Sequence, residues 1–193
     1  MTTMLRNRTL VLAGVLAALL FFTRYSYFGL SAYCANASLA VFLLGGFYLR
    51  RHQLFAGFLA FALLIDALAL WQGHVSAALF TRAYLFEPLA YALLWYGAAR
   101  LALRARSPLA LGGGMLLLAT IAFTLTNGSF YWLSGFFPGA SMSGWAADFA
   151  RWAPLFVGTT IAYVALVMGG VEAVRRIGAR GATVGSVHGA SRA

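Results

Sequence analysis

The feature that most constrains this chain is a series of six apolar segments separated by short stretches that carry most of its charge. A membrane-spanning helix needs about 20 apolar residues, with about 17 as the lower limit. The first two segments are shorter, so we expect them to be tilted, extended by their neighbours or partly broken. The pattern predicts a helical membrane protein. The segments cover about residues 9–23, 37–49, 53–72, 83–103, 109–126 and 153–174.

The composition agrees with lipid as the solvent. Of the 193 residues, 62% are hydrophobic and 9% are charged, whereas a soluble domain carries about 25% charged residues. Six spans leave no length for a separate soluble domain. We therefore predict an all-α membrane protein with a single six-helix transmembrane domain over residues 1–176. The Gly-, Ala- and Ser-rich residues 177–193 are predicted to form a disordered cytoplasmic tail.

The arginines predict the orientation of the spans. All 14 basic residues are arginine, and the net charge is +10. Because they lie between apolar runs rather than on one face, lipid and topology explain them better than nucleic acid does. With the N-terminus inside, only Arg24, Arg82 and Arg151 would face outward, as the positive-inside rule requires. We expect both termini in the cytoplasm. The inner set would be Arg6, Arg8, Arg50, Arg51, Arg100, Arg104, Arg106, Arg175, Arg176, Arg180 and Arg192.

Three segments would reach the outer face: 24–36, 72–82 and the long stretch 127–151. Residues 126–145 hold six aromatic rings and no charge, and their glycines disfavour a long helix. Irregular backbone at membrane depth survives only where protein or a water-filled cavity satisfies it. We expect an outward-facing cavity suited to a large, mostly neutral, partly apolar ligand. An aromatic belt at the membrane interface is the alternative.

Three polar side chains near the outer ends of the spans are candidates for function. Asp66 lies near the outer end of the third apolar segment and Glu87 near the outer start of the fourth. Intramembrane carboxylates are costly and usually functional, but both could instead form salt bridges with Arg82 or Arg24. His74 is either a ligand-binding residue or a surface or capping residue.

Cys34 is the single cysteine, so an internal disulfide is impossible. In an outer loop its thiolate would be a strong ligand for a transition metal. The alternative is that it packs as a small hydrophobic residue. Elsewhere in the outer half, Asp148 and Arg151 are one helical turn apart, which predicts a local ion pair.

Catalytic motifs are absent from the sequence. It contains no GxSxG, HExxH, CxxC or P-loop pattern, so the chain has no means of hydrolysing ATP itself. Two non-transport hypotheses stay open. One is an intramembrane enzyme that uses Asp66, Glu87 and His74 as acid–base groups. The other is a structural subunit whose outer loop docks a partner protein.

Three sequence blocks carry a family resemblance. FTRYSYFG, ASLAVFLLGGFYLRR and LTNGSFYWLSG resemble the small solitary S-components of energy-coupling-factor vitamin transporters, specifically the BtuM-like cobalamin family. The resemblance implies six helices in the bacterial inner membrane, both termini inside, and one vitamin bound near the outer face. It implies a transport protein with no cofactor of its own. An S-component for another vitamin is the nearest alternative.

The resemblance also implies a ligand site. The rings of 130–132 and 136–137 would cover the corrin of cobalamin, and nearby hydroxyls and amides would bond its side chains. The complete set of candidate ligand-binding residues is Tyr33, Cys34, Asp66, His74, Tyr84, Asn127, Ser129, Phe130, Tyr131, Trp132 and Ser134.

In the family, a cysteine just before a T-x-A-Y pattern ligates cobalt and is linked to removal of the cyano group from cyanocobalamin. This chain keeps Thr81-Arg82-Ala83-Tyr84 but has Ala78-Leu79-Phe80 before it. Cys34 is therefore the first candidate ligand for the cobalt and His74 the second, since imidazole also suits this metal.

Family members dock on a shared transmembrane subunit with two ATPases through small residues spaced by four on the first helix. Here Ala13 and Ala17, and Gly14 and Ala18, have this spacing, which is common in membrane helices. Solitary members can act without a dedicated energising module.

Overall fold

A computed structural model describes residues 2–29, 36–74 and 76–190. These residues form six α-helices and two short 3-10 helices, which confirms the all-α fold class. The elements are α1 (Thr2–Gly29), α2 (Ser38–Tyr48), α3 (His52–Trp71), η1 (Ala77–Leu79), η2 (Arg82–Leu85), α4 (Phe86–Arg104), α5 (Pro108–Leu133) and α6 (Met142–Ala190).

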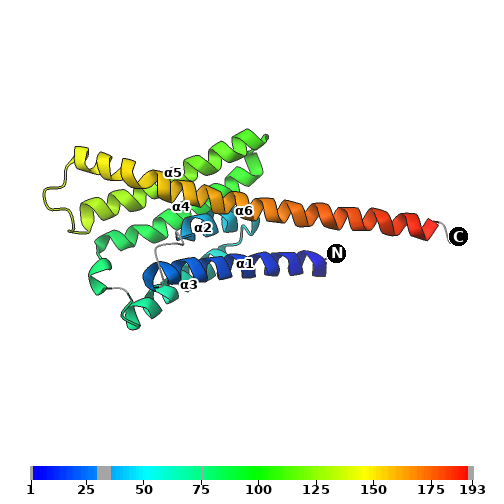
Figure 1. Ribbon diagram of the computed structural model, residues 1–193, viewed down its shortest axis with the longest axis horizontal. Helices are drawn as coiled ribbons and strands as arrows, with labels where there is room; N and C mark the ends of the chain where they lie inside the picture. The colour runs from blue at the N-terminus through cyan, green and yellow to red at the C-terminus, as the bar shows by residue number, and fades with distance from the viewer. Residues whose placement is uncertain (1, 30–35, 75, 191–193) are drawn as a thin grey trace.

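The helices lie roughly side by side, and the chain reverses direction from one to the next (Figure 1). The start of α1, the α2–α3 turn and the α4–α5 turn lie toward one end, which we call the terminal end. The η1–η2 segment and the α5–α6 connection lie at the opposite end, the loop end. α6 extends past the rest of the bundle on the terminal side, so both helical termini point the same way.

The helix boundaries correct one prediction. α5 runs on to Leu133, so the expectation of a long irregular segment over 127–151 is wrong; only residues 134–141 separate α5 from α6. A single glycine such as Gly128 weakens a helix by only about 1 kcal/mol relative to alanine. The break comes later, where Gly135 and Gly139 adopt φ of +80° and +75°, a backbone region that favours glycine.

The C-terminal part of α6 also differs from expectation. Residues 177–190 are helical, where the sequence predicts a disordered tail. Just before them, the Glu172 carboxylate forms salt bridges with Arg175 and Arg176 at 3.3 and 2.8 Å. Such pairs at i,i+3 and i,i+4 support a helix.

α2 lies at the centre of the packing although it has only 11 residues, of which eight are buried. Its Gly46 packs directly on α4, because a Cβ at this position would lie 2.0 Å from the backbone oxygen of Trp95. The neighbouring Phe42 ring stacks on the Tyr91 ring with 4.1 Å between centroids. The short second apolar segment is thus an inner helix that lets α4 approach closely.

The outer surface of the bundle is apolar. Among the described residues, three helical stretches are long and apolar enough to cross a membrane: His52–Trp71, Pro108–Leu133 and Met142–Ile177. In their most apolar 18-residue windows, only 28%, 22% and 11% of residues are buried inside the protein. The remainder needs an apolar solvent, which supports a membrane protein. Exposed examples are Leu10, Val11, Val15, Phe22, Leu63, Leu64, Leu116, Leu117, Ile121, Leu155 and Leu166.

Candidate functional site

The most buried charge in the described chain is Arg24, near the loop end of α1. Its side chain is 1% exposed. Nε donates to Asp66 Oδ1 and Nη2 donates to Asp66 Oδ2, both at 2.6 Å. This two-bond geometry between guanidinium and carboxylate is the strongest form of charged hydrogen bond available to side chains. It fixes α1 against α3.

The other donors of Arg24 reach two more helices. Nη1 donates to Ser38 Oγ at 2.9 Å and to Tyr91 Oη at 2.6 Å, and Nη2 donates to Glu87 Oε2 at 3.0 Å. All five N–H bonds of the guanidinium therefore have acceptors. One side chain on α1 binds α2, α3 and α4, elements far apart in the sequence.

The acceptors are satisfied as well. Asp66 is 2% exposed and also accepts a hydrogen bond from the Tyr84 hydroxyl of η2. Glu87 is 27% exposed and accepts from Tyr91 Oη at 3.1 Å through Oε1. We call Arg24, Ser38, Asp66, Tyr84, Glu87 and Tyr91 the Arg24 cluster. The salt-bridge alternative for the two carboxylates is present, with Arg24 as partner while Arg82 is exposed.

The remaining predicted residues on this side do not join the cluster in the described contacts. His74 lies in the turn after α3, and its ring meets the edge of the Tyr25 ring at 5.9 Å. Tyr33 and Cys34 lie outside the described residues. Within the described ranges, no group of three or more His, Cys, Asp or Glu side chains could hold a metal ion.

A second polar contact ties α5 to α6. The Asn127 side chain donates to Asp148 Oδ2 at 2.8 Å and accepts from Trp145 Nε1 at 3.1 Å. Asp148 thus bonds across the helix pair, and the predicted partner Arg151 lies instead over the Trp152 ring at 5.2 Å. Asn127 was predicted as a ligand residue, and here it is a link between two helices.

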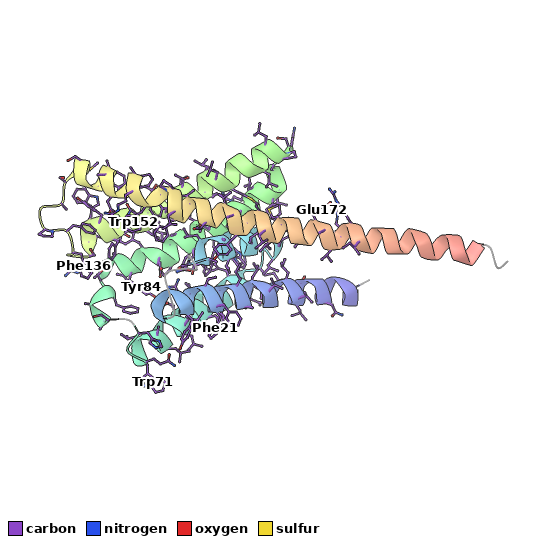
Figure 2. All side chains as sticks on the ribbon, in the orientation of Figure 1. Phe21, Trp71, Tyr84, Phe136, Trp152 and Glu172 are labelled. Atoms are coloured by element: carbon purple, nitrogen blue, oxygen red, sulfur yellow. The ribbon has the colours of Figure 1, made fainter. Side chains whose placement is uncertain are left out.

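The aromatic residues of the α5–α6 connection pack on rings at the end of α5. Phe137 contacts Tyr131 with 4.5 Å between ring centroids and Phe130 with 6.1 Å. Phe136 stacks on Phe130 at 5.8 Å, and Trp132 meets Tyr131 at 5.3 Å. Figure 2 shows Phe136 at the loop end, the same end as Tyr84 and Trp71. We call Asn127, Phe130, Tyr131, Trp132, Phe136, Phe137, Trp145 and Asp148 the aromatic cap.

Two serines that the sequence predicts as ligand-binding residues form hydrogen bonds with nearby backbone groups. Ser129 is buried and donates to the Thr126 carbonyl at 3.0 Å. Ser134, at the end of α5, accepts from the Phe136 N–H at 3.2 Å. Both hydroxyls stabilise the end of α5 and the start of the loop. Neither contact aims the side chain at a ligand.

Two cavities lie away from the aromatic cap. One of about 500 Å³ opens between α5 and α6, lined by Leu116, Thr120, Phe149, Ala150, Ala153, Pro154, Val157, Gly158 and Ile161. Another of about 260 Å³ lies beside the α4–α5 turn and includes Phe47, Arg106 and Pro108. Neither is lined by residues of the aromatic cap. The rings of residues 130–137, which the sequence assigns to a ligand, contact one another in this structure.

Sequence reasoning missed Ser38 and Tyr91 as members of the Arg24 cluster. A signal for Tyr91 was present, because it follows Glu87 by four residues and so shares its face of α4. Arg24 itself sits beside an apolar segment, where a charged side chain is costly and marks a buried partner. Ser38 carries no such signal.

Comparison with known proteins does not identify a family. No protein-family model matches the chain, and no curated protein matches it.

Proposed function

We propose that this chain is a six-span protein of the bacterial inner membrane that binds cobalamin or a related corrinoid at the periplasmic face and moves it across the membrane. It would be an S-component of the BtuM-like kind. Support comes from the all-helical bundle, its apolar surface and the three sequence blocks that resemble this family.

The observation that carries the proposal is the segregation of charge and aromatic residues between the two ends. The terminal end has the short connections 49–51 and 105–107, which hold Arg50, Arg51 and Arg106. The loop end has the aromatic cap. Under the positive-inside rule the terminal end is cytoplasmic. Both helical termini then lie in the cytoplasm, and the aromatic cap faces the periplasm.

Corrinoid binding at the aromatic cap requires the cap to open. The Phe130, Tyr131, Phe136 and Phe137 rings contact one another, so a corrin would replace ring–ring contacts with ring–corrin contacts. The glycines at 135 and 139, both at positive φ, delimit the segment that would move. The apolar edges of the corrin suit exposed rings, and its amide side chains suit the amide and hydroxyl groups around them.

The Cys34 thiolate would be the cobalt ligand, with His74 as the alternative. His74 belongs to the α1–α3 side of the loop end, where it contacts Tyr25. Its use would bring the corrin across the bundle from the aromatic cap.

The proposed partner surface is one face of α1. Gly14 and Ala18 are exposed, and a Cβ on Gly14 would meet nothing within 4 Å. Ala13 and Ala17 are half-buried and pack against the core. Of the two small-residue pairs, Gly14 and Ala18 are therefore the pair available to an energy-coupling transmembrane subunit, which a close helix approach would suit.

Purification from cells supplied with cobalamin tests the function. We expect a coloured sample with corrin absorption, and less bound corrinoid in Trp132→Ala. Trp152→Ala is the matched control, since Trp152 is similarly exposed on α6 but lies outside the cap. A colourless wild-type protein would reject corrinoid binding. If Cys34→Ser leaves the spectrum of bound cobalamin unchanged, the thiolate is not the ligand.

Topology is tested separately by accessibility labelling. Cys34 is the only cysteine, so wild type reports on residue 34 and a Cys34→Ser/Trp132→Cys variant reports on the cap. We expect both to react with an impermeant thiol reagent from the periplasmic side. Labelling of the two positions from opposite sides would overturn the six-span arrangement.

A further inference from the structure

The Arg24 cluster contains an imbalance of charge. One guanidinium faces two carboxylates, those of Asp66 and Glu87. If both are ionised, the cluster carries a net charge of −1 within the apolar bundle. The tyrosine hydroxyls of the cluster are neutral donors and do not offset this charge.

Such an excess is costly at this position. Arg24 and Asp66 are 1% and 2% exposed, and a buried ion without a partner of opposite charge is strongly unfavourable. One additional positive charge restores neutrality. A proton is the smallest carrier of that charge, and it fits the contacts already present without displacing a side chain.

The contacts distinguish the two carboxylates. Asp66 holds both of its oxygens against the guanidinium and accepts from Tyr84 as well. Glu87 has one bond from Arg24, through Oε2. Its Oε1 meets Tyr91 Oη at 3.1 Å, a contact in which a protonated carboxyl can also be the donor. Glu87 is also 27% exposed, whereas Asp66 is 2% exposed.

We propose that Glu87 carries one proton in the folded protein and exchanges it with the aqueous phase at the loop end, so that the Arg24 cluster is a proton-binding site. This inference is independent of the corrinoid proposal. Loss of the proton leaves the cluster with its excess negative charge. This favours movement of the start of α4 away from Asp66 on α3 and toward water.

The surroundings of Glu87 support a single proton. The titratable groups that face it are Arg24 on α1, Asp66 on α3, Tyr84 on η2 and Tyr91 on its own helix. α2 contributes the hydroxyl of Ser38, and α5, which packs against η2 and α4, has no charged residue in its sequence. Arg82 of η2 is exposed.

A proton-binding site in the Arg24 cluster would serve a transport protein. The site lies in the half of the bundle that holds the loop end and links the four helices α1 to α4. Release of the proton changes the strength of that link. A chain without a nucleotide motif then has a way to respond to a proton gradient.

The small number of carboxylates makes the test direct. The chain has four Asp and Glu residues, and Glu87 and Glu172 are its two glutamates. We would label glutamate with carboxyl ¹³C in the Glu172→Gln protein, in lipid nanodiscs, so that the only labelled side chain is Glu87. Glu172 is an exposed partner of two arginines on α6, so its replacement leaves the cluster intact.

The expected result is a ¹³C infrared band of a protonated carboxylic acid at neutral pH. It should be lost on alkaline titration and should recover when the pH is lowered. A carboxylate band at neutral pH would overturn the proposal. As a second measurement, unlabelled wild type and Glu87→Gln are compared in deuterium exchange difference spectra. The exchangeable acid band should be present in wild type and absent in Glu87→Gln, and its persistence in that variant would also overturn the assignment.

Discussion

The Arg24 cluster and the aromatic cap lie in the same half of the bundle, but they hold their helices together in different ways. The cluster joins four elements through charged hydrogen bonds around one buried guanidinium. The cap joins α5 to α6 through the amide of Asn127, and its ring contacts hold the α5–α6 connection on the end of α5. The hydrogen bonds of the Arg24 cluster share one guanidinium and are lost together, whereas the ring contacts of the cap can be exchanged for contacts with a ligand. The cluster is suited to fixing the bundle, and the cap to opening.

Replacing Arg24 with methionine should have the largest effect on stability. The change removes five hydrogen bonds and leaves Asp66 buried without its counter-ion. Breaking a buried pair in this way costs about 3–5 kcal/mol. We would measure the free energy of unfolding in detergent micelles. Arg82→Met, at an exposed arginine of the same loop end, should change it by about 0.5 kcal/mol or less. Equal effects of the two changes would show that the cluster does not hold the helices together.

Asn127→Ala tests the amide link of the cap. It leaves the Asp148 carboxylate and the Trp145 indole N–H, both half-buried, without their shared partner. An unsatisfied buried polar group costs about 1–3 kcal/mol, so a loss in this range is expected in the same unfolding measurement. Trp145→Phe removes only the N–H···O bond and keeps a ring. It should cost less than Asn127→Ala, and the reverse order would show that ring packing dominates the cap.

Tyr84→Phe removes a single hydroxyl from the cluster. Tyr84 donates to Asp66, which keeps both bonds from Arg24, so the expected loss is about 1.5–3 kcal/mol, typical for a hydrogen bond to a charged group. Tyr96→Phe is the control. Its hydroxyl contacts His52 in an exposed position, and its loss should change stability by about 0.5 kcal/mol or less. A Tyr84→Phe protein as stable as wild type would remove η2 from the cluster.

How much the sequence could predict differs between the two regions for a physical reason. The apolar segments located α2, α3 and α4 to within three residues at each end, because hydropathy follows from the residues themselves. Glycine content did not predict that α5 continues through 127–133. Tyr131 in this stretch is buried, and its packing offsets the weak helix propensity of the glycine. The cluster depends on pairing between distant helices. The sequence indicates Asp66, Glu87 and Arg24 as possible salt-bridge residues, but only the fold shows that a single guanidinium binds both carboxylates.

Trp132→Ala should have the smallest effect on stability and is the most informative about the cap as a ligand site. Trp132 is 44% exposed and contacts Tyr131 edge-on, so removing it should change the free energy of unfolding by about 0.5 kcal/mol. If the cap exchanges ring–ring for ring–ligand contacts, the same change should weaken corrinoid binding about tenfold, equivalent to about 1.4 kcal/mol. A ring that serves only as a membrane-interface anchor would leave ligand affinity unchanged.

Arg24→Met should show the opposite pattern. It should greatly lower the free energy of unfolding, and the corrinoid affinity of the molecules that remain folded should change less than in Trp132→Ala. Because the two variants separate stability from binding, they decide whether the two regions have different roles.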